Sequence, residues 1–306
     1  MNPIPHPIPY QGSKRSLAIE IMQYFPFSFN TLIEPFAGSA AITIAAAANK
    51  RGEFYHINDL NKPLMDLWLA IVETPEEISL RYEALWFHQL EDPRSYYDSV
   101  RADFNRTGRP DLLLYLLARC VKGAVRYNSQ GEFNQSPDNR RLGMKPETMR
   151  LQILGASHHL RGKITITSGD YRDILGRATA ADLVYMDPPY QGVSGNRDTR
   201  YLHNVQLYDF AHALDKLNQR GIRFLVSYDG RTGDKTYGKY LPHELNLTRI
   251  ELVAGRSSQA TLLGRDAVTV ESLYLSPSLA DELAHKPIRY RVTQGEQMYL
   301  LEGQLQ

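Results

Sequence analysis

Apolar runs of four to eight residues, each closed by a turn signal, mark the strands that the sequence predicts. They lie at residues 31–34, 54–57, 164–167, 183–186, 224–227 and 268–275. Continuous apolar runs of this length are typical of strands buried on both faces of a parallel sheet. Helical patterns follow the first two runs, at 41–49 and 64–72. Strands that alternate with helices in this way predict an α/β fold.

Between the second and third predicted strands the pattern is helical. Aromatic and aliphatic side chains recur at helical spacing over residues 75–122 and again over 146–160. A polar stretch rich in Asn, Arg and Gly, residues 123–143, connects the two. This order predicts a mostly helical module inserted into the α/β domain. The predicted domains are an α/β domain over 1–61 and 161–306 and an inserted module over 62–160.

The composition excludes several classes of protein. The 306 residues carry 35 Lys and Arg against 34 Asp and Glu, so the whole chain has no net field that would attract nucleic acid. The one cysteine, Cys120, rules out an internal disulfide framework and a multi-cysteine metal site, and we predict no bound metal. No basic start with an apolar stretch opens the sequence, and no segment reaches the ~20 apolar residues of a membrane span. These features predict a cytoplasmic protein without a membrane partner.

The tetrapeptide Asp187-Pro188-Pro189-Tyr190 directly follows the predicted strand 183–186. Open parallel sheets bind ligands at the carboxyl ends of their strands, so this sequence is a candidate active site. The prolines fix φ and lack N–H donors, which leaves carbonyl oxygens and the Asp187 carboxylate as acceptors. An exocyclic amino group on a planar base suits such acceptors, and Tyr190 can stack on the base. A strand that ends in a Pro-Pro turn with a surface tyrosine has the same sequence, so the motif alone leaves both interpretations open.

A glycine turn and an acidic residue follow the first two predicted strands. Gly38 lies in the turn after 31–34, and Asp59 follows 54–57, 21 residues beyond Gly38. In nucleotide-binding α/β folds, an acid ~20 residues after the glycine turn bonds ribose hydroxyls. The full dinucleotide-binding glycine pattern is absent here, so an ordinary helix-packing turn is the alternative.

The inserted module holds a local excess of positive charge that the total hides. Residues 119–150 contain seven basic and three acidic residues, which gives a net charge of +4 and a candidate phosphate-contacting surface. Amide and aromatic side chains interleave with these charges, and amides of this kind read base edges. The candidate DNA-contacting residues are Arg126, Asn128, Phe133, Asn134, Arg140 and Arg141. A solvated loop of mixed polarity would have the same composition.

Five segments together resemble those of the Dam-like, alpha-group DNA adenine-N6 methyltransferases, in the family's order and within residues 10–275. The segments are 10–15 (Tyr-Gln-Gly-Ser-Lys-Arg), 34–39 (Glu-Pro-Phe-Ala-Gly-Ser), 58–61 (Asn-Asp-Leu-Asn), 168–171 (Ser-Gly-Asp-Tyr) and 187–190 (Asp-Pro-Pro-Tyr). Residues 126–134 add a sixth match, to the start of the family's DNA-recognition hairpin. The chain departs from the family at Tyr10, where many members carry tryptophan, and at Ala40, where a second glycine is common.

This resemblance implies a Rossmann-like sheet, S-adenosylmethionine as the methyl donor, and an adenine in double-stranded DNA as the acceptor. The cofactor-binding residues that it implies are Tyr10, Lys14, Glu34, Phe36, Gly38, Asp59, Asp170, Tyr171 and Asp187. The catalytic residues that it implies are Asp187, Pro188 and Tyr190. A restriction-modification, phage or host epigenetic context is implied as well, with a cognate restriction endonuclease as a candidate partner.

Base flipping follows from this assignment, because a duplex adenine must leave the helical stack to reach a pocket at a strand end. Acceptors at Asp187 and the Pro188 carbonyl would then favour a pyramidal amino nitrogen and stabilise the charge that develops during transfer. We predict that residues 191–206, which follow the tetrapeptide, form a mobile loop that orders over the substrate.

Three other activities share parts of this pattern. Cytosine-N4 methyltransferases usually resemble Ser-Pro-Pro-Tyr, and glutamine methyltransferases usually show Asn-Pro-Pro-Tyr, so the acid at Asp187 favours adenine. A catalytically silent DNA-binding regulator would have no need of the Asp187, Lys14 and Asp59 that this chain contains.

Overall fold

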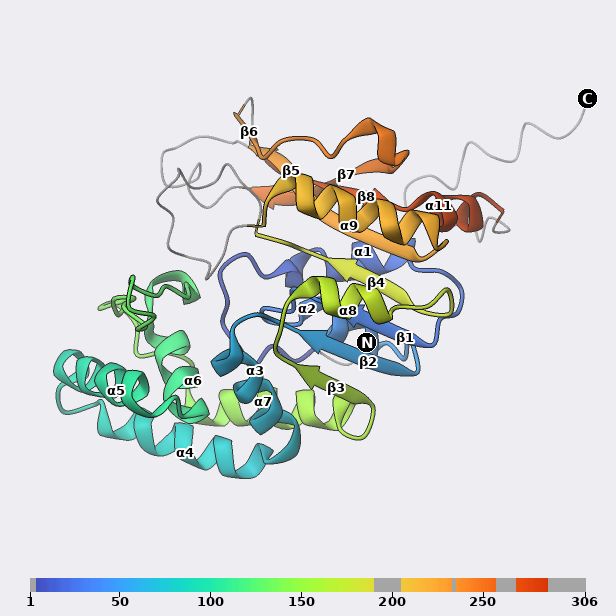
Figure 1. Cartoon of the computed structure of the whole chain (residues 1–306). Helices are drawn as coiled ribbons and strands as arrows, with labels where there is room; N and C mark the ends of the chain where they lie inside the picture. The colour runs from blue at the N-terminus through green and yellow to red at the C-terminus, as the bar shows by residue number, and fades with distance from the viewer. Residues whose placement is uncertain (1–3, 190–204, 233–234, 257–267, 286–306) are drawn as a thin grey trace, which may run out of the picture.

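The computed structural model describes residues 4–189, 205–232, 235–256 and 268–285, and it shows one twisted sheet with helices on both faces (Figure 1). The strands are β1 (Thr31–Glu34), β2 (Phe54–Asn58), β3 (Ile164–Thr167), β4 (Leu183–Met186), β5 (Arg223–Thr232), β6 (Lys235–Tyr237), β7 (Thr248–Arg256) and β8 (Val268–Leu275). Their order in the sheet is β3-β2-β1-β4-β5-β8-β7, and the short β6 pairs with the end of β5. The predicted α/β fold is confirmed.

The direction of the strands brings four turns to one edge of the sheet. β1 to β5 run parallel, whereas β8 lies antiparallel between β5 and β7. Because the carboxyl ends of parallel strands meet at one edge, the turns after β1, β2, β3 and β4 open side by side. The strand order reverses at β1, whose neighbours are β2 and β4. A reversal of this kind is where open α/β sheets bind ligands.

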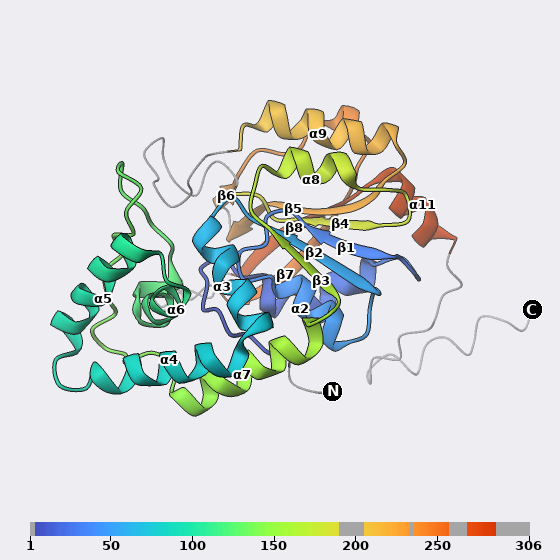
Figure 2. The same ribbon diagram turned by 60° about the horizontal axis from the view of Figure 1, so that its bottom comes forward.

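Helices cover both faces of this sheet. The α-helices are α1 (Ala18–Ile21), α2 (Ala41–Ala48), α3 (Lys62–Glu73), α4 (Pro75–His88), α5 (Pro93–Thr107), α6 (Pro110–Arg119), α7 (Pro146–Leu160), α8 (Tyr171–Arg177), α9 (Leu207–Gln219) and α11 (Pro277–Ala284). The 3-10 turns are η1 (Lys14–Ser16), η2 (Met22–Tyr24), η3 (Val121–Gly123) and η4 (His243–Leu245). α8 and α9 lie on one face, and α2, α3 and α7 lie on the other (Figure 2).

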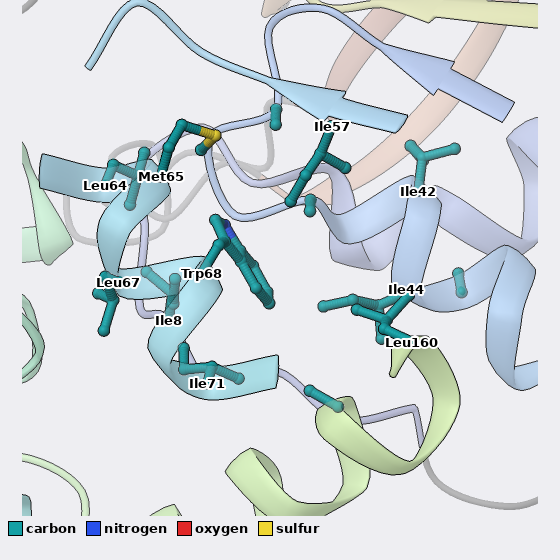
Figure 3. Packing of buried hydrophobic residues seen from close by; sticks show 14 of the residues in the cluster. Ile8, Ile42, Ile44, Ile57, Leu64, Met65, Leu67, Trp68, Ile71 and Leu160 are labelled. Atoms are coloured by element: carbon teal, nitrogen blue, oxygen red, sulfur yellow. The ribbon is translucent and has the colours of Figure 1, made fainter. Parts of the chain in front are cut away.

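The hydrophobic core consists of two clusters, one on each face of the sheet. Successive strand residues point to opposite faces, so Leu32 of β1 belongs to one cluster and Ile33 to the other. Trp68 of α3 is fully buried in the first cluster. Figure 3 shows its ring among side chains of the sheet, α2 and α7, including Ile57, Ile42 and Leu160. The indole Nε1 donates a hydrogen bond of 3.0 Å to the carbonyl of Gly38, so this core packing also supports the turn after β1.

The helices between β2 and β3 form a lobe beside the sheet, in which α4, α5 and α6 lie farthest from the strands (Figure 1). The apolar pattern of α6 is buried almost completely, from Leu112 to Leu117. α3 and α7 contact both this lobe and the layer that covers the sheet. One hydrophobic cluster therefore runs from the sheet into the lobe. The hydrophobic core thus continues across the predicted boundaries at 61/62 and 160/161. The division into two domains stays a prediction.

Several elements differ from the sequence prediction. β5 extends beyond the predicted 224–227, and neither β6 nor β7 was predicted. β7 is an edge strand with charged residues on its exposed side, so it lacks the continuous apolar run of a central strand. None of the helices in the described part of the chain combines the length and the apolarity that a bilayer span requires.

Candidate active site

A cavity of about 610 Å³ lies at the carboxyl edge of the parallel strands. Its size is in the range of about 300–1,000 Å³ that is usual for small-molecule sites. The cavity gathers the described residues that were predicted to bind cofactor or act in catalysis. These are Tyr10, Lys14, Glu34, Phe36, Gly38, Asp59, Asp170, Tyr171, Asp187 and Pro188. Tyr190 and most of the predicted loop lie outside the described residues, and only Val205 and Gln206 of that loop are seen, both in the cavity lining.

Glu34 ends β1 and is 3% exposed. Its Oε2 accepts hydrogen bonds from the backbone N–H of Thr43 at 3.1 Å and from the Thr43 hydroxyl at 2.6 Å. Burial raises the pKa of Glu34 to about 8, against the lowering effect of the hydrogen bonds from Thr43. Glu34 thus ties the end of β1 to the first turn of α2 and fixes the shape of the turn between them.

Two residues of that turn have left-handed backbones. Gly38 has φ +50°, and a Cβ at this position would lie 3.0 Å from the Tyr10 ring. Ala40, the residue that stands where a second glycine is common in the family, has φ +46°. A non-glycine residue in this region is strained by about 1–2 kcal/mol. Alanine therefore keeps the glycine-like backbone of this turn, although it lacks the conformational freedom of glycine.

Asp59, at the end of β2, is bonded to both neighbouring turns. Its Oδ2 accepts the N–H of Gly38 at 3.0 Å, and its Oδ1 accepts the N–H of Asn61 at 2.9 Å. Burial raises the pKa of Asp59, and these backbone hydrogen bonds oppose that rise. Asn58 connects the turns after β1 and β3, because its Nδ2 donates to the carbonyls of Pro35 at 3.2 Å and of Gly169 at 2.9 Å. The turns after β1, β2 and β3 are therefore cross-braced by side chains.

The wall formed after β3 is aromatic and charged. Asp170 caps α8 by accepting the N–H of Arg172 at 2.8 Å, and it also forms an ion pair with the Arg172 guanidinium at 2.6 Å. Tyr171 lies next to Phe36, with ring centroids 4.9 Å apart and planes tilted by 35°. Both rings line the cavity, which gives a flat apolar surface beside a carboxylate.

Asp187 follows β4 and forms an ion pair inside the cavity. Its Oδ2 lies 2.9 Å from Nζ of Lys14, and the same Nζ lies 3.3 Å from Oε2 of Glu271 in β8. Burial raises the pKa of Asp187 to about 6, the charge of Lys14 lowers it, and the charge of Glu271 raises it further. The partner of Asp187 is thus another predicted cofactor residue, whereas Glu271 was not predicted. Its strand is separated from the tetrapeptide by some eighty residues, and no motif in the sequence pointed to it.

The segment 126–134 forms a small hairpin in the inserted module. The N–H of Asn134 bonds the carbonyl of Arg126 at 3.0 Å, and the N–H of Asn128 bonds the carbonyl of Glu132 at 2.8 Å. Both ends of the Asn128 amide are used within the turn, because its Nδ2 donates to Glu132 and its Oδ1 accepts the N–H groups of Gln130 and Glu132. Asn128 therefore shapes the hairpin in this structure.

Phe133 was predicted as a DNA-contacting residue, and the structure corrects this. The side chain is 1% exposed and packs edge-on against Phe104 and Tyr127, each with a centroid distance of 6.0 Å. A ring enclosed in this way has no face for a base. Phe133 supports the hairpin from beneath, and the sequence could not separate this role from stacking because both require an aromatic residue.

The predicted arginines lie on the surface and differ in their partners. Arg126 is exposed, and among the described residues no ion pair of its guanidinium is seen. Arg140 and Arg141 are also exposed, but their guanidinium groups lie 3.2 Å and 3.8 Å from Asp138. Of these three residues, Arg126 is the one whose charge is left unpaired by the described part of the module.

The hairpin segment also forms part of the cavity wall. Tyr127 and Val125 line the cavity, and the Tyr127 hydroxyl donates to Oδ1 of Asn61 at 3.1 Å. At the other side, the N–H of Gln11 donates to the carbonyl of Gly123 at 3.0 Å. Residues 123–127 of the inserted module are thus hydrogen-bonded to the turn after β2 and to the N-terminal segment, both of which line the cavity. In the regions that the structure describes, no three His, Cys, Asp or Glu side chains gather into a metal-binding group.

Comparison with known proteins identifies the family of the chain. Residues 10–255 match the family of D12 class N6 adenine-specific DNA methyltransferases. The chain is 28% identical over 256 residues to the type II methyltransferase M1.LlaDCHI of Lactococcus lactis subsp. cremoris, a match that covers 78% of this chain and 87% of the relative. It is 26% identical to the retron Ec67 DNA adenine methylase of Escherichia coli, covering 82% and 87% of the two chains. The DNA adenine methylase of Vibrio cholerae is 25% identical, covering 89% and 96%. The family match spans most of the chain, which therefore belongs to the D12 class N6 adenine-specific DNA methyltransferases.

Proposed function

We propose that this chain transfers a methyl group from S-adenosylmethionine to the N6 amino group of an adenine flipped out of double-stranded DNA. The observation that carries the proposal is the position of Asp187 and Pro188 at the carboxyl end of β4, in the cavity that also contains Lys14 and Asp59. A carboxylate and a backbone carbonyl at this point provide the two acceptors that an exocyclic amino group requires.

The chemistry of the cavity fits this cofactor. Among the described residues, five acidic side chains line it, Glu34, Asp59, Asp170, Asp187 and Asp209, against the two cations Lys14 and Arg172. Burial raises the pKa of Glu34 to about 8, so Glu34 is mostly protonated at pH 7, but the other four acids still outnumber the cations. An acidic cavity suits a ligand that carries both a sulfonium and an ammonium group. When bound, S-adenosylmethionine would supply an electrophilic methyl group on its sulfonium. The space beside Asp187 is where that methyl group would have to lie for transfer in line with the adenine nitrogen.

Individual residues have distinct proposed roles in holding the cofactor. Asp59 uses one lone pair of each oxygen for the N–H groups of Gly38 and Asn61, and its remaining lone pairs can accept ribose hydroxyls. The rings of Phe36 and Tyr171 would flank the cofactor base, with Asp170 near its edge. Tyr10, Lys14, Glu34 and Gly38 complete the proposed set around the turn after β1.

For catalysis, we assign the central role to the Asp187 carboxylate. Its charge is held by Lys14 at 2.9 Å, so the carboxylate is oriented before substrate arrives. An acceptor fixed in this way stabilises the positive charge that develops on the amino nitrogen without reorganising first. The Pro188 carbonyl would accept the second N–H, and Tyr190 would stack on the flipped base.

Contacts with DNA are proposed for the exposed polar residues of the inserted module. Arg126 and Asn134 lie side by side on the hairpin and are exposed, so they are available to base edges or phosphates. Arg140 and Arg141 would contact phosphates, after exchanging their ion pairs with Asp138 for the DNA backbone. Asn128 would join them only by leaving its turn hydrogen bonds, and Phe133 is not retained.

The biological setting is proposed from the substrate. An enzyme that modifies chromosomal or phage DNA in bacteria acts in the cytoplasm, and a cognate restriction endonuclease is a partner that such a modification would protect against. One relative of this chain is named a type II methyltransferase and another belongs to a retron. Resistance of DNA from an expressing cell to a panel of endonucleases would identify the protected sequence.

The test is the identity of the methylated nucleoside. The wild-type chain and Asp187→Ala are each incubated with tritiated S-adenosylmethionine and DNA from a methyl-free host, and the DNA is digested to nucleosides. We expect the label in N6-methyladenine with the wild type and none with Asp187→Ala, which should still bind much of the cofactor. Label in N4-methylcytosine, or in protein alone, would refute the proposed function.

A further inference from the structure

Lys14 lies between two carboxylates that belong to distant parts of the chain. Its Nζ is 2.9 Å from Asp187 at the end of β4 and 3.3 Å from Glu271 in β8. The Lys14 side chain is 8% exposed, and those of Asp187 and Glu271 are 20% and 23% exposed. Glu271 is not among the residues that line the cavity. Its contact with Lys14 therefore joins the cavity to β8, and Glu271 acts on the cavity through its charge and through its hold on Lys14.

The charges of this cluster do not cancel. Among the described residues, the Lys14 ammonium and the carboxylates of Asp187 and Glu271 together carry a net charge of −1, whereas Lys14 and Asp187 alone would be neutral. In a partly buried cluster such a difference is felt more strongly than in bulk water. Burial of this kind costs free energy unless every charge has a partner, and the second carboxylate adds to that cost. A single acid would have been enough to anchor Lys14, so the second acid calls for a functional reason.

We propose that Glu271 is a positioning residue that anchors Lys14 beside Asp187 while keeping the cluster anionic, so that the cavity binds the cationic methyl donor in preference to its neutral product. This inference rests on the proposed function, since it concerns the cofactor of that reaction. The donor carries a sulfonium charge, and the thioether left after transfer does not. An anionic cluster stabilises the first and has no such attraction for the second, which favours release of the product.

The groups around Asp187 agree with this role. Within the described parts of the chain, the charged or titratable side chains that act on Asp187 are Lys14 of η1, Glu271 of β8, Glu34 of β1 and Tyr185 of β4. Burial raises the pKa of Asp187, Lys14 lowers it, and Glu271 raises it. Removal of the Glu271 charge should therefore lower the pKa of Asp187 as well as neutralise the cluster.

The experiment compares binding of S-adenosylmethionine and S-adenosylhomocysteine to the wild type, Glu271→Gln and Glu271→Asp by titration calorimetry. The quantity of interest is the ratio of the two dissociation constants, product over donor. Glu251→Gln is the matched control, because Glu251 is an exposed acid on the adjacent strand β7 that pairs with Arg231 and Arg249. We expect Glu271→Gln to lower the ratio roughly threefold to tenfold, and Glu271→Asp and Glu251→Gln to leave most of it intact.

The outcomes separate this inference from the proposed function. If Glu271→Gln weakens both ligands equally, Glu271 is only structural and the inference is overturned. If the wild type binds neither nucleoside, the proposed function itself fails. The wild type gives an independent measurement in case the variant does not fold. Its preference for the donor should decrease as the pH falls through about 6 and Asp187 gains a proton, and a preference that stays constant from pH 7 to pH 5 would contradict the anionic cluster.

Discussion

The cavity and the hairpin differ in where their polar side chains come from and in how exposed these side chains are. The polar groups of the cavity come from the N-terminal segment and from turns after four strands, and many of them bond to one another, as Asp59 does with Gly38 and Asn61. The hairpin is one continuous segment, 126–134, with exposed polar side chains above a buried aromatic layer. A site that performs chemistry needs groups fixed in advance, whereas a site that reads DNA needs donors that are still available. The two regions nevertheless share a wall, at Tyr127.

The largest effect is expected from a substitution that removes a charge in the cavity and leaves the hairpin unchanged. Asp187→Asn keeps the shape of the side chain and removes its charge, so the rate of methyl transfer should fall about 100- to 1,000-fold. DNA affinity should stay near that of the wild type. Single-turnover rates with tritiated donor and a DNA-binding titration measure the two quantities. Asp281→Asn, an exposed acid of α11 outside the cavity lining, is the control. Near-normal turnover by Asp187→Asn would remove the residue from the mechanism.

A second substitution disturbs the contact between the inserted module and the N-terminal segment that lines the cavity. Gly123 has φ +61°, and a Cβ there would lie 2.9 Å from the backbone of Pro9. Gly131, at the hairpin turn, has φ +78° and open space around it. Both alanine variants are strained, but only Gly123→Ala also forces the N-terminal segment away. Its free energy of unfolding should drop by about 1–3 kcal/mol more than that of Gly131→Ala.

Urea titrations of both glycine variants give these free energies, and cofactor affinity should follow the same order. Equal losses of stability in the two variants would mean that the close approach to Pro9 is unimportant.

The pH dependence should separate the two regions without any mutation. Burial raises the pKa of Asp187 to about 6, so the carboxylate is ionised above that pH and protonated below it. The protonated form loses its charge and one acceptor, and the transfer rate at pH 5 should be about tenfold lower than at pH 7. Guanidinium groups keep their charge across this range, so DNA affinity should vary less. A single-turnover rate that is flat from pH 5 to pH 8 would contradict the assignment.

Arg126→Ala tests the hairpin alone. Loss of an exposed guanidinium should weaken DNA binding about tenfold and reduce the dependence of log affinity on log salt by about one. Arg140→Ala is a matched control, because the Arg140 guanidinium is already paired with Asp138, and its effect should be smaller. Binding isotherms at several salt concentrations measure both. If the two variants behave alike, the distinction between paired and unpaired arginines has no functional meaning.

The smallest effect is expected at Tyr127, which belongs to the hairpin and lines the cavity. Tyr127→Phe removes the hydroxyl that bonds Asn61 and keeps the ring in place, at a cost of about 1 kcal/mol, or roughly fivefold in an equilibrium. Cofactor affinity should fall by up to this factor. Tyr82→Phe, whose hydroxyl bonds the Met144 carbonyl within the lobe, is the control and should change stability only. Identical cofactor affinities in the two variants would exclude coupling through Tyr127.

The sequence predicted most strands of the sheet, including β3 at one edge, but it missed β7 at the other edge. The strands 31–34, 164–167, 183–186 and 268–275 have the predicted bounds, because each lies in a short run rich in apolar and β-branched residues. β7 was missed, since an edge strand with an exposed side needs no such run. The place of β8 between β5 and β7 could not be predicted either, because strand order depends on packing between distant segments.

The same contrast applies to the site. Residues in local motifs were predicted to bind the cofactor, Lys14 from the family resemblance alone and Asp59 also from its place after a predicted strand. Glu271 was missed because its contact with Lys14 exists only once β8 has paired with β5. Phe133 was assigned wrongly because composition gives the type of a side chain and not its exposure.

The central claim is that Asp187 and the flipped adenine meet in one cavity with the cofactor, while the hairpin stays on the duplex. A crystal structure with S-adenosylhomocysteine and a duplex carrying the recognised sequence tests it most directly. We predict the Asp187 carboxylate and the Pro188 carbonyl within about 3 Å of the adenine N6, with Arg126 in contact with DNA outside the cavity. An adenine that remains stacked in the duplex, or an N6 that is bound without Asp187, would contradict the account.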